Sequence, residues 1–518
     1  MLTERVRLFL LGTAALLPLL AFVAVLWRRY YRDDADNTAR RVAKNSTLPI
    51  AANLVNRAID LGFAAITLRA LGPADNGDYS LAALIAGLYF LTISNWGLND
   101  LTVREVAADQ ALAPRLFSIT LLLRCGIAAL LIPAAAGVVG FYALIGKPLS
   151  AAAVGALALL TLHLLPAALA AACSASFQAF QRMEVPAFVA LLTNVLKVLL
   201  GTAVLLAGGR VVALAGVALA VTTLNGLIFL ALQQRLLFPA RLIWDWSEGR
   251  RRLREAFPLL LNSLLLVVFF RFDYLILRAF FPDPAVVGTY DAAYKLINMT
   301  TIVPAYFVAA LLPVLARYAA TDRAALQRAY RHALALLQMI AWPAAVAVAV
   351  LARELILLLG GKNYLPGAAQ ALAILIWFLP LSYANGMTQY VLIALRRQHA
   401  ITAAFGVAAA FNLAANLLLI PRYGYLAAAA LTVATELAIM VTFVRVLRAE
   451  GAVPPLVALT WRPALAALVT GAAMLAAYQL GWPVAALVAP PVYLAVLWLL
   501  GAFGAEERAL VRRVLGRS

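Results

Sequence analysis

Charged side chains lie inside stretches of this sequence that are otherwise almost entirely apolar. The segment from Pro258 to Lys295 carries Arg271 and Asp273 in one apolar run, and Asp291 and Lys295 in the next. A charge in the middle of a membrane-spanning helix costs about 2.5–3.5 kcal/mol on insertion scales, so it usually faces a cavity or a partner. These charges therefore indicate either buried ion pairs or the binding of a charged ligand.

Helical spacing decides which of these charges can pair along one helix. Arg271 and Asp273 are two residues apart, about 200° around a helix, so each needs another partner, water or a ligand. Residues three or four apart share a face and can form an ion pair, and two such pairs occur: Arg57 with Asp60, and Asp291 with Lys295. Three further charges, Arg124, Lys197 and Glu436, also lie deep in apolar runs, where structural and functional roles are equally compatible with the sequence.

The composition requires a membrane to hold these helices. Of 518 residues, 65% are hydrophobic and 13% are charged, against about 25% charged in soluble proteins. The apolar runs are about 20 residues long, rich in Ala and Leu, and without period-two alternation, which favours membrane helices over a β-barrel. The net charge of +19 is explained by loops on one side of a membrane, rather than by nucleic acid.

No cysteine or histidine pattern points to a metal or a cofactor. Cys125 and Cys173 both lie in apolar runs and give neither a disulfide framework nor metal-ligand spacing. The three histidines are scattered. We therefore expect no metal and no cofactor.

The predicted topology is one N-terminal anchor at 8–27 and fourteen further spans. These lie at about 46–70, 78–98, 116–143, 150–177, 186–207, 211–234, 256–280, 286–313, 330–351, 367–394, 399–420, 424–446, 460–480 and 483–503. Most Lys and Arg residues fall in the loops on one side, which identifies that side and the C-terminus as cytoplasmic. We predict a multi-pass protein of the inner, cytoplasmic membrane.

A weak internal repeat divides the chain. Pro49, Asn53, the triplet 68–70 and Pro73 recur at a constant offset of 209 residues, as Pro258, Asn262, 277–279 and Pro282; Gly77 and Tyr79 recur at an offset of 211. The repeat predicts two parallel six-helix bundles related by an axis along the membrane normal, with substrate bound between them.

The repeat also predicts the domain boundaries. We expect a membrane anchor and basic linker at 1–45, an N-lobe at 46–235, a cytoplasmic interfacial linker at 236–255, a C-lobe at 256–447, and two further helices with a basic cytoplasmic tail at 448–518. Trp244 and Trp246 sit beside a run of arginines in the linker, a pattern typical of a segment that lies against anionic lipid headgroups.

Three passages of the sequence carry a resemblance to a known family. They are LRALGPADNGDYSLA with NWGLNDLTVRE, VVGTYDAAYKL with LLPVLARY, and ELILLLGGKNYLPGAAQALAIL with IPRYGYLAAAALTVATE, and they span most of residues 40–450. The chain resembles the oligosaccharide/polysaccharide flippases (Wzx-type exporters) of the MATE-like MOP superfamily. The resemblance implies an all-α fold of two six-helix bundles in a V, a central cavity, and a polyprenyl-diphosphate oligosaccharide as substrate. The N-terminal anchor departs from the family pattern.

The resemblance gives the deep charges candidate roles. Arginine offers bidentate contact to a diphosphate, and asparagine amides could bond sugar hydroxyls, although helix packing would explain the asparagines equally well. The predicted substrate-binding residues are Arg57, Arg271, Lys295, Asn53, Asn262 and Arg124. The predicted ion-coupling residues, which would bind a proton or Na⁺, are Asp60, Asp273 and Asp291.

The sequence thus favours a flippase that performs no chemistry and moves a lipid-linked glycan by alternating access, for cell-surface polysaccharide biosynthesis. Anionic lipids and polysaccharide assembly proteins are its expected partners. A lipid II flippase or a cation-coupled drug exporter is the alternative, although a cation exporter should have an acidic cavity and these charges are mostly basic. A polytopic glycosyltransferase or polymerase would need catalytic groups in a sizeable outer loop, and the outer loops here are short. We therefore do not expect an enzyme.

Overall fold

The computed structural model describes residues 38–451 and 456–502, and within these ranges the chain is helical, with turns and no β-strand. The predicted anchor at 8–27 and most of the basic tail lie outside the described residues. The chain divides into two compact units, Met1–Asp291 and Ala292–Ser518. This division falls well beyond the predicted linker at 236–255, and the two-lobe division proposed from the repeat stays a prediction.

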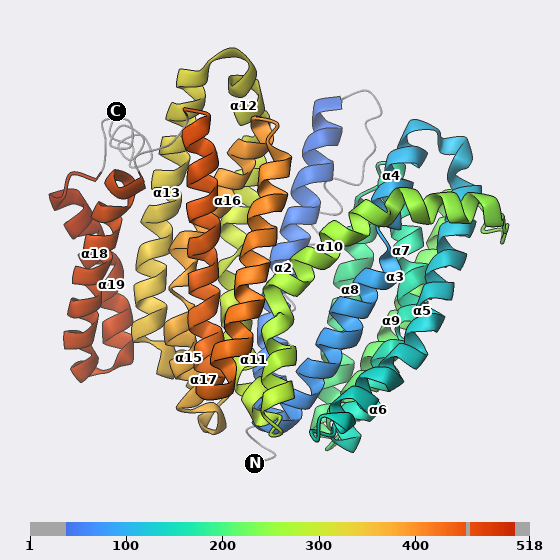
Figure 1. Ribbon diagram of the computed structural model, residues 1–518, viewed down its shortest axis with the longest axis horizontal. Helices are drawn as coiled ribbons and strands as arrows, with labels where there is room; N and C mark the ends of the chain where they lie inside the picture. The colour runs from blue at the N-terminus through green and yellow to red at the C-terminus, as the bar shows by residue number, and fades with distance from the viewer. Residues whose placement is uncertain (1–37, 452–455, 503–518) are drawn as a thin grey trace. The chain divides into compact units, whose positions relative to one another are not determined.

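The first unit is a bundle of long helices (Figure 1). In chain order its elements are α2 (Thr38–Leu84), η1 (Ile85–Phe90), α3 (Leu91–Asn95), α4 (Leu98–Ala108), η2 (Gln110–Leu112), α5 (Ala113–Leu144), α6 (Ala151–Leu162), α7 (Leu164–Ala179), α8 (Glu184–Leu206), α9 (Val211–Leu236), α10 (Trp246–Phe280) and the start of α11 (Ala285–Thr300). Apolar residues of α2, η1, α5, α6, α8 and α9 contribute to one buried core.

The second unit continues from α11 and is also helical (Figure 1). Its elements are α12 (Ile302–Thr321), α13 (Arg323–Val350), α14 (Ala352–Leu359), η3 (Lys362–Tyr364), α15 (Gly367–Leu375), α16 (Phe378–Ala394), α17 (Gln398–Ala449), α18 (Leu456–Ala477), η4 (Tyr478–Leu480) and α19 (Trp482–Leu499). Apolar side chains of α13, α18 and α19 pack in a shared core, so the two last helices belong to this unit.

Ten helical stretches of the described residues are long and apolar enough to cross a membrane. Two of them, Asn53–Asn95 and Gln398–Ala449, are 43 and 52 residues long, and each covers all or most of two predicted spans. The helical path breaks inside each at a glycine with positive φ, Gly72 (74°) and Gly424 (59°). A residue without a Cβ adopts this conformation at no steric cost. The multi-pass helical prediction is confirmed, and within the described residues every predicted span from 46–70 onward is mainly helical; the number of crossings stays a prediction.

Three predicted spans are each split where the sequence prediction placed one continuous helix: 150–177, 286–313 and 367–394. A proline follows each break by a few residues, and it cannot donate to the carbonyl four residues before it. These prolines are Pro166, Pro304 and Pro380. At the second break the freed carbonyl oxygen of Thr300 accepts a hydrogen bond from the Tyr383 hydroxyl at 2.6 Å.

The helix α10 begins inside the predicted linker, ten residues before the predicted span at 256–280. Asp245 precedes its first turn, and the Asp245 carboxylate accepts a hydrogen bond from the Glu248 backbone N–H at 3.1 Å. An aspartate at this position caps a helix, and the residues that follow are good helix formers. One helix therefore connects the predicted interfacial segment to the turn that bears Arg271.

A reciprocal backbone contact joins the two repeated turns of the first unit. A Cβ atom on Gly77 would lie 2.7 Å from the carbonyl carbon of Pro284, and one on Gly288 would lie 2.9 Å from that of Pro73. In this contact each glycine lies against the proline of the other turn, so Pro73 corresponds to Pro284. The shared pattern is therefore PAxxGxY, at 73–79 and 284–290. The predicted alignment of Pro73 with Pro282 is wrong, because the offset between the repeats changes from 209 to 211 residues before this turn and not within it. We call this contact the glycine clasp.

Candidate functional site

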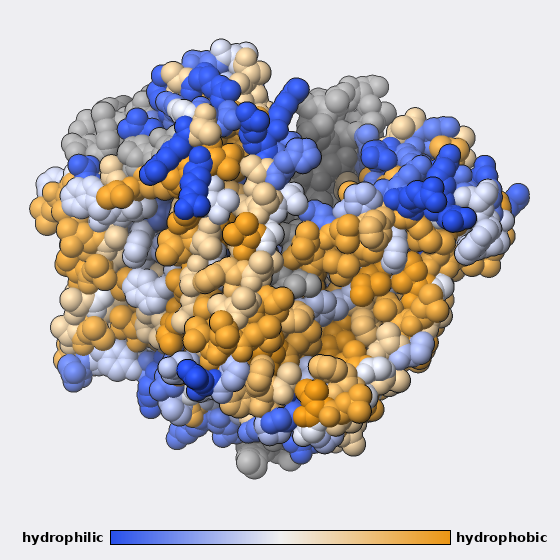
Figure 2. All heavy atoms as spheres, viewed as in Figure 1, coloured by the Kyte–Doolittle hydropathy of each residue, from blue (hydrophilic) through white to orange (hydrophobic). Residues whose placement is uncertain are grey.

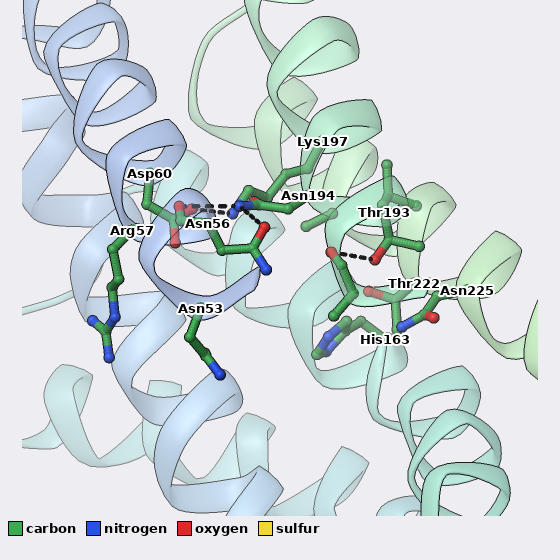
Figure 3. A pocket seen from close by; sticks show the side chains of 13 residues that line it. Asn53, Asn56, Arg57, Asp60, His163, Thr193, Asn194, Lys197, Thr222 and Asn225 are labelled. Carbon is green, nitrogen blue, oxygen red and sulfur yellow. Dashed lines mark hydrogen bonds and ion pairs between the residues drawn. The ribbon is translucent and has the colours of Figure 1, made fainter. Parts of the chain in front are cut away.

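A polar pocket of about 540 Å³ opens within the first unit. It is lined by α2, α8, α9 and the junction of α6 with α7, and Figure 3 shows its polar side chains gathered from these helices. The volume lies within the range of about 300–1,000 Å³ that is usual for ligand sites. Its polar lining consists of Asn53, Asn56, Arg57, Asp60, His163, Thr193, Asn194, Lys197, Thr222 and Asn225.

Two side-chain contacts between α2 and α8 form one wall of this pocket. The Asn194 amide donates to the Asn56 side-chain oxygen at 3.0 Å, and the Lys197 ammonium lies 2.8 Å from the Asp60 carboxylate. Asn56 and Asp60 are four residues apart on α2, and Asn194 and Lys197 are three apart on α8. Each pair of residues therefore shares one face of its helix, and the two faces are opposite one another. The contacts set the spacing of α2 and α8 on this side of the pocket.

The predicted ion pair of Arg57 with Asp60 is wrong. Asp60 points toward α8 and pairs with Lys197, while Arg57 extends away from it (Figure 3). The reason is that a lysine on the neighbouring helix lies directly opposite Asp60 and pairs with it instead. Among the described residues Arg57 has no carboxylate within ion-pair distance, and its side chain is exposed.

The electrostatics of the pocket favour an anionic or hydroxyl-rich ligand. Its lining holds two basic side chains, Arg57 and Lys197, and one acidic side chain, Asp60. The Lys197 and Asp60 side chains are 37% and 40% exposed, and such solvated pairs contribute only about 0–1 kcal/mol. A ligand could therefore compete for Lys197 at small cost.

The pocket also offers hydrogen-bond acceptors. The Asn225 side-chain oxygen is buried and has no partner among the described residues. The His163 Nδ1 lies 3.2 Å from the Leu160 carbonyl oxygen. Because a carbonyl only accepts, Nδ1 carries the proton and Nε2 of the neutral ring remains an acceptor. A sugar hydroxyl both donates and accepts hydrogen bonds, so neighbouring donors and acceptors suit it.

The deep charges of α10 lie outside this pocket. Asp273 is 5% exposed and accepts a hydrogen bond from the Tyr290 hydroxyl at 2.6 Å. Arg271 is half-buried and donates to the Tyr274 hydroxyl at 3.0 Å. Asp273 therefore has a partner on α11, as the spacing argument required.

Asp291 is bound by neutral donors beside the glycine clasp. Its carboxylate accepts hydrogen bonds from the Asn76 amide at 3.1 Å, the Ser80 hydroxyl at 2.8 Å and the Tyr274 hydroxyl at 3.3 Å. Lys295 is half-buried one turn further along α11. The predicted pairing of Asp291 with Lys295 stays a prediction, and so do the ion-coupling roles.

Two other predicted substrate residues do not line the pocket. Arg124 is 1% exposed and donates to the Asn99 side-chain oxygen at 2.5 Å, which fits an internal structural contact between α5 and α4. Asn262 is exposed on α10. Of the predicted set, Asn53, Arg57 and Asp60 are brought together.

Sequence reasoning missed most of the amide and hydroxyl groups of the pocket. A signal was present: Asn194 and Lys197 are three apart in an otherwise apolar run, and Asn53, Asn56 and Asp60 recur at helical spacing. The prediction rested mainly on charged residues and on two repeat-related asparagines, Asn53 and Asn262, and it therefore missed the amides of Asn56, Asn194 and Asn225.

A second polar cluster lies in the second unit. Glu436 is 5% exposed, and the Asn385 amide donates to its carboxylate at 2.6 Å. Nearby, the Asn412 amide donates to the Thr435 hydroxyl at 2.9 Å, and Asn416 donates to Asn412 at 2.7 Å. These bonds satisfy the Glu436 carboxylate and several buried amide hydrogens, while the side-chain oxygens of Asn385 and Asn416 are buried with no partner among the described residues.

The fold and the ten long apolar helical stretches of the described residues define a multi-pass helical membrane protein. Residues 42–319 match the model of the family described as polysaccharide biosynthesis protein, and residues 258–418 match the MatE family model. The first match extends over more than half of the chain, which belongs to the polysaccharide biosynthesis protein family. No curated protein matches the chain.

Solved structures with the MOP-superfamily fold are similar to the chain. The lipid II flippase MurJ in an inward closed conformation has a TM-score of 0.72 at 14% identity, covering 90% of this chain and 100% of its own. An inward-facing multidrug resistance MATE transporter has a TM-score of 0.60 at 16% identity, covering 76% and 94%. A variant of a MATE transporter from Vibrio cholerae has a TM-score of 0.51 at 15% identity, covering 80% and 98%. The predicted superfamily fold is confirmed.

Proposed function

We propose that this protein carries a polyprenyl-diphosphate-linked oligosaccharide across the cytoplasmic membrane by alternating access, for the synthesis of a cell-surface polysaccharide. The observation that carries the proposal is the pocket on α2, α8 and α9, with its amides and the guanidinium of Arg57, which has no carboxylate within ion-pair distance in the part of the chain that the structure describes. The family membership supports a role in polysaccharide biosynthesis. No chemical step is assigned to the protein.

The lining of the pocket fits the two parts of such a substrate. A diphosphate carries negative charge through a region of low dielectric, and an arginine can bind it with two parallel hydrogen bonds. The amides of Asn53 and Asn56 and the acceptor of Asn225 suit sugar hydroxyls. A pocket for cationic drugs would instead be expected to carry more acidic than basic groups.

The remaining assignments follow from the sequence. We propose that the arginine-rich loops and the C-terminus lie on the cytoplasmic side of the inner membrane, because the positive residues gather in the loops of one side. Arg271, Lys295 and Asn262 stay candidates for substrate contact, although none of them is part of the pocket lining; Arg124 stays a weaker candidate, because its side chain is buried against Asn99. Of the proposed coupling residues, Asp60 lies in the pocket, while Asp273 and Asp291 lie on α10 and α11.

Substitution of Arg57 tests the proposal in cells. The host should lack its own exporter and depend on this protein, and glycan export should be measured together with the amount of membrane-inserted protein. Arg57→Ala should lose export at an unchanged protein level, and Arg57→Lys should keep part of it, because charge remains but bidentate contact does not.

A matched control is Arg210→Ala, which removes another exposed arginine, one that pairs with Asp75 outside the pocket. It should export normally. Full export by Arg57→Ala, or an equal loss in the control, would contradict a binding role for this pocket.

A further inference from the structure

The start of α10 carries an exposed surface that no transport step requires. It consists of Arg241, Leu242, Ile243, Trp244, Trp246, Arg250 and Arg254, all exposed, and we call it the Arg-Trp surface. Trp244 and Trp246 are 50% and 65% exposed, and their rings lie 5.7 Å apart. Figure 2 shows hydrophilic side chains gathered over the first turns of α10, beside a hydrophobic face.

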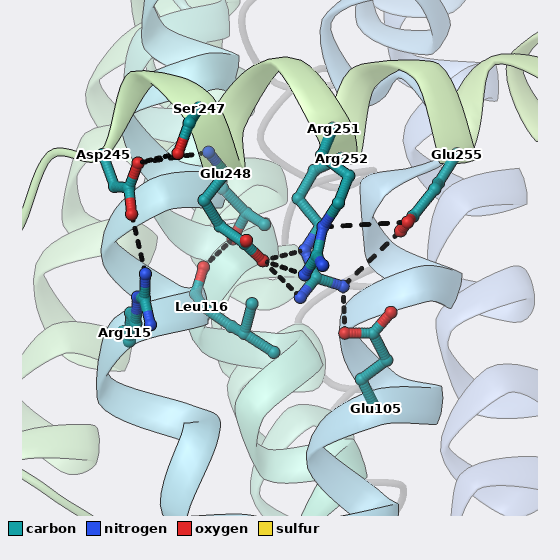
Figure 4. A network of polar contacts seen from close by, with 10 residues as sticks. Glu105, Arg115, Leu116, Asp245, Ser247, Glu248, Arg251, Arg252 and Glu255 are labelled. Atoms are coloured by element: carbon teal, nitrogen blue, oxygen red, sulfur yellow. Dashed lines mark hydrogen bonds and ion pairs between the residues drawn. The ribbon is translucent and has the colours of Figure 1, made fainter.

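The arginines of this segment fall into two groups with different surroundings. Arg252 is buried and pairs with Glu105 of α4 and with Glu248, the latter at 2.7 Å, as Figure 4 shows. Arg251 is exposed but pairs with Glu248 at 2.7 Å and lies 3.8 Å from Glu255. Their charges are therefore already compensated within the protein.

The other group has no such compensation. Arg241, Arg250 and Arg254 are exposed, and none has a carboxylate within ion-pair distance among the described residues. Trp246, Arg250 and Arg254 follow one another at intervals of four residues, so these three side chains form one stripe on the exposed face of α10, and Arg241 lies just before the helix. The stripe combines free positive charge with large indole rings.

The opposite face holds this stripe in place. Trp96 donates from its indole N–H to the Leu253 carbonyl oxygen at 3.0 Å, and Arg115 pairs with Asp245 at 2.7 Å. The Ser118 hydroxyl donates to the Arg241 carbonyl oxygen. With its inner face fixed on α4 and α5, the segment presents the Arg-Trp surface in a constant orientation.

We propose that the Arg-Trp surface binds the headgroups of anionic phospholipids in the membrane leaflet that it meets. The unpaired arginines would attract the phosphates, and the tryptophans would lie at the level of the headgroups, where amphipathic rings are enriched. Because α10 continues without a break to Arg271, the bound lipid would also hold the start of a helix that carries a deep charge. The proposal does not depend on which substrate is carried.

The test uses the full-length protein in lipid nanodiscs. Cys125 and Cys173 are replaced by Ala, and a bimane label is attached at Ile243→Cys, an exposed position within the surface. Quenching is compared for brominated phosphatidylglycerol and brominated phosphatidylcholine in otherwise equal bilayers. The wild-type surface should be quenched more strongly by phosphatidylglycerol, with an enrichment of up to about fivefold per arginine at low salt, falling as salt rises.

Two variants separate the surface from general charge. The triple variant with glutamine at 241, 250 and 254 should lose the preference and give a quenching ratio near one. Arg251→Gln removes a positive charge from the same turn, but that charge is already paired, so the preference should remain. A wild-type ratio of one, or an equal loss with Arg251→Gln, would overturn the proposal. Displacement of the preference by low concentrations of inorganic pyrophosphate would overturn it in favour of a soluble or substrate diphosphate.

Discussion

Replacing Gly77 with alanine should destabilise the protein, because the glycine clasp leaves no room for a side chain. The new Cβ would lie 2.7 Å from the carbonyl carbon of Pro284 and 3.0 Å from the Gly288 nitrogen. Contacts between carbon atoms are optimal at about 3.5–4.0 Å, and the Pro284 carbonyl oxygen would lie still nearer to the new Cβ than its carbon, so the two backbones would have to separate by at least about 1 Å. The obstacle is backbone, so it cannot turn aside as a flexible side chain would.

The separation would weaken a small set of hydrogen bonds. The Asn76 amide donates to the Gly288 carbonyl oxygen at 3.3 Å, and Asn76 and Ser80 both donate to Asp291. Each such bond contributes about 0.5–1.5 kcal/mol, and overpacking typically costs about 1–3 kcal/mol. We expect Gly77→Ala to lower the free energy of unfolding by about 1–3 kcal/mol.

The assay is thermal unfolding of the purified protein in detergent, followed by the loss of monodisperse protein. Gly62→Ala is the matched control, because it lies on the same helix with nothing within 4 Å of the new Cβ. This control should be neutral or raise stability by up to about 1 kcal/mol through helix propensity. Gly288→Ala should behave like Gly77→Ala. A Gly77→Ala protein as stable as Gly62→Ala would refute the clasp.

Further predictions concern the charged residues. Exchanging Asp60 for Asn together with Asp273→Asn should abolish gradient-driven transport and leave the protein folded; full transport would remove both from the mechanism. Lys197→Gln should change the free energy of unfolding by no more than about 1 kcal/mol, since its ion pair is half-exposed, yet lower export, as a side-by-side melt and export assay would measure. Arg271→Ala should lose export at normal protein levels and Arg271→Lys should keep part of it; lost export together with lost protein would make Arg271 structural. Hydrogen bonds from Ser247, from the Glu248 backbone N–H and from Arg115 lower the pKa of Asp245 from its ordinary 3.8 to about 2. A carboxyl whose pKa is lower in the folded state stabilises above its ordinary pKa and loses this contribution as pH falls from about 4 to 2. Asp245→Asn should flatten that part of a pH–melting curve, and an unchanged curve would contradict the assignment.

Much of the fold could be predicted because the membrane spans and their flanking loops can be recognised from the order of residues along the chain alone. Apolar runs of bilayer length and arginine-rich loops follow directly from the cost of polar groups in lipid. Even the repeated turns at Gly77 and Gly288 were visible as a repeat. The breaks at Pro166, Pro304 and Pro380 were missed because hydropathy averages over a proline, although the lost hydrogen bond is local and could have been anticipated.

The site was less predictable because it depends on which helices are neighbours. Asp60 was assigned to Arg57 by spacing on one helix, but it pairs with Lys197, which is 137 residues away in sequence. Nothing in the sequence of α2 says that α8 packs against it. For the same reason Arg124, which has the appearance of a cavity residue in the sequence, is buried between helices of its own unit. The sequence shows which charged residues lie inside apolar runs, but the packing of the helices determines which residues they contact.

The central claim is tested most directly by measuring translocation with the purified protein in proteoliposomes. The substrate is a polyprenyl-diphosphate oligosaccharide with a fluorescent label that an impermeant reductant bleaches from outside, with labelled lipid II and a cationic dye as parallel substrates. We predict that the wild-type protein raises the fraction of polyprenyl-diphosphate oligosaccharide that becomes accessible, that it does so more than for either parallel substrate, and that Arg57→Ala does not. No movement of the oligosaccharide by well-folded protein, or movement of lipid II or the dye in its place, would contradict the proposed function.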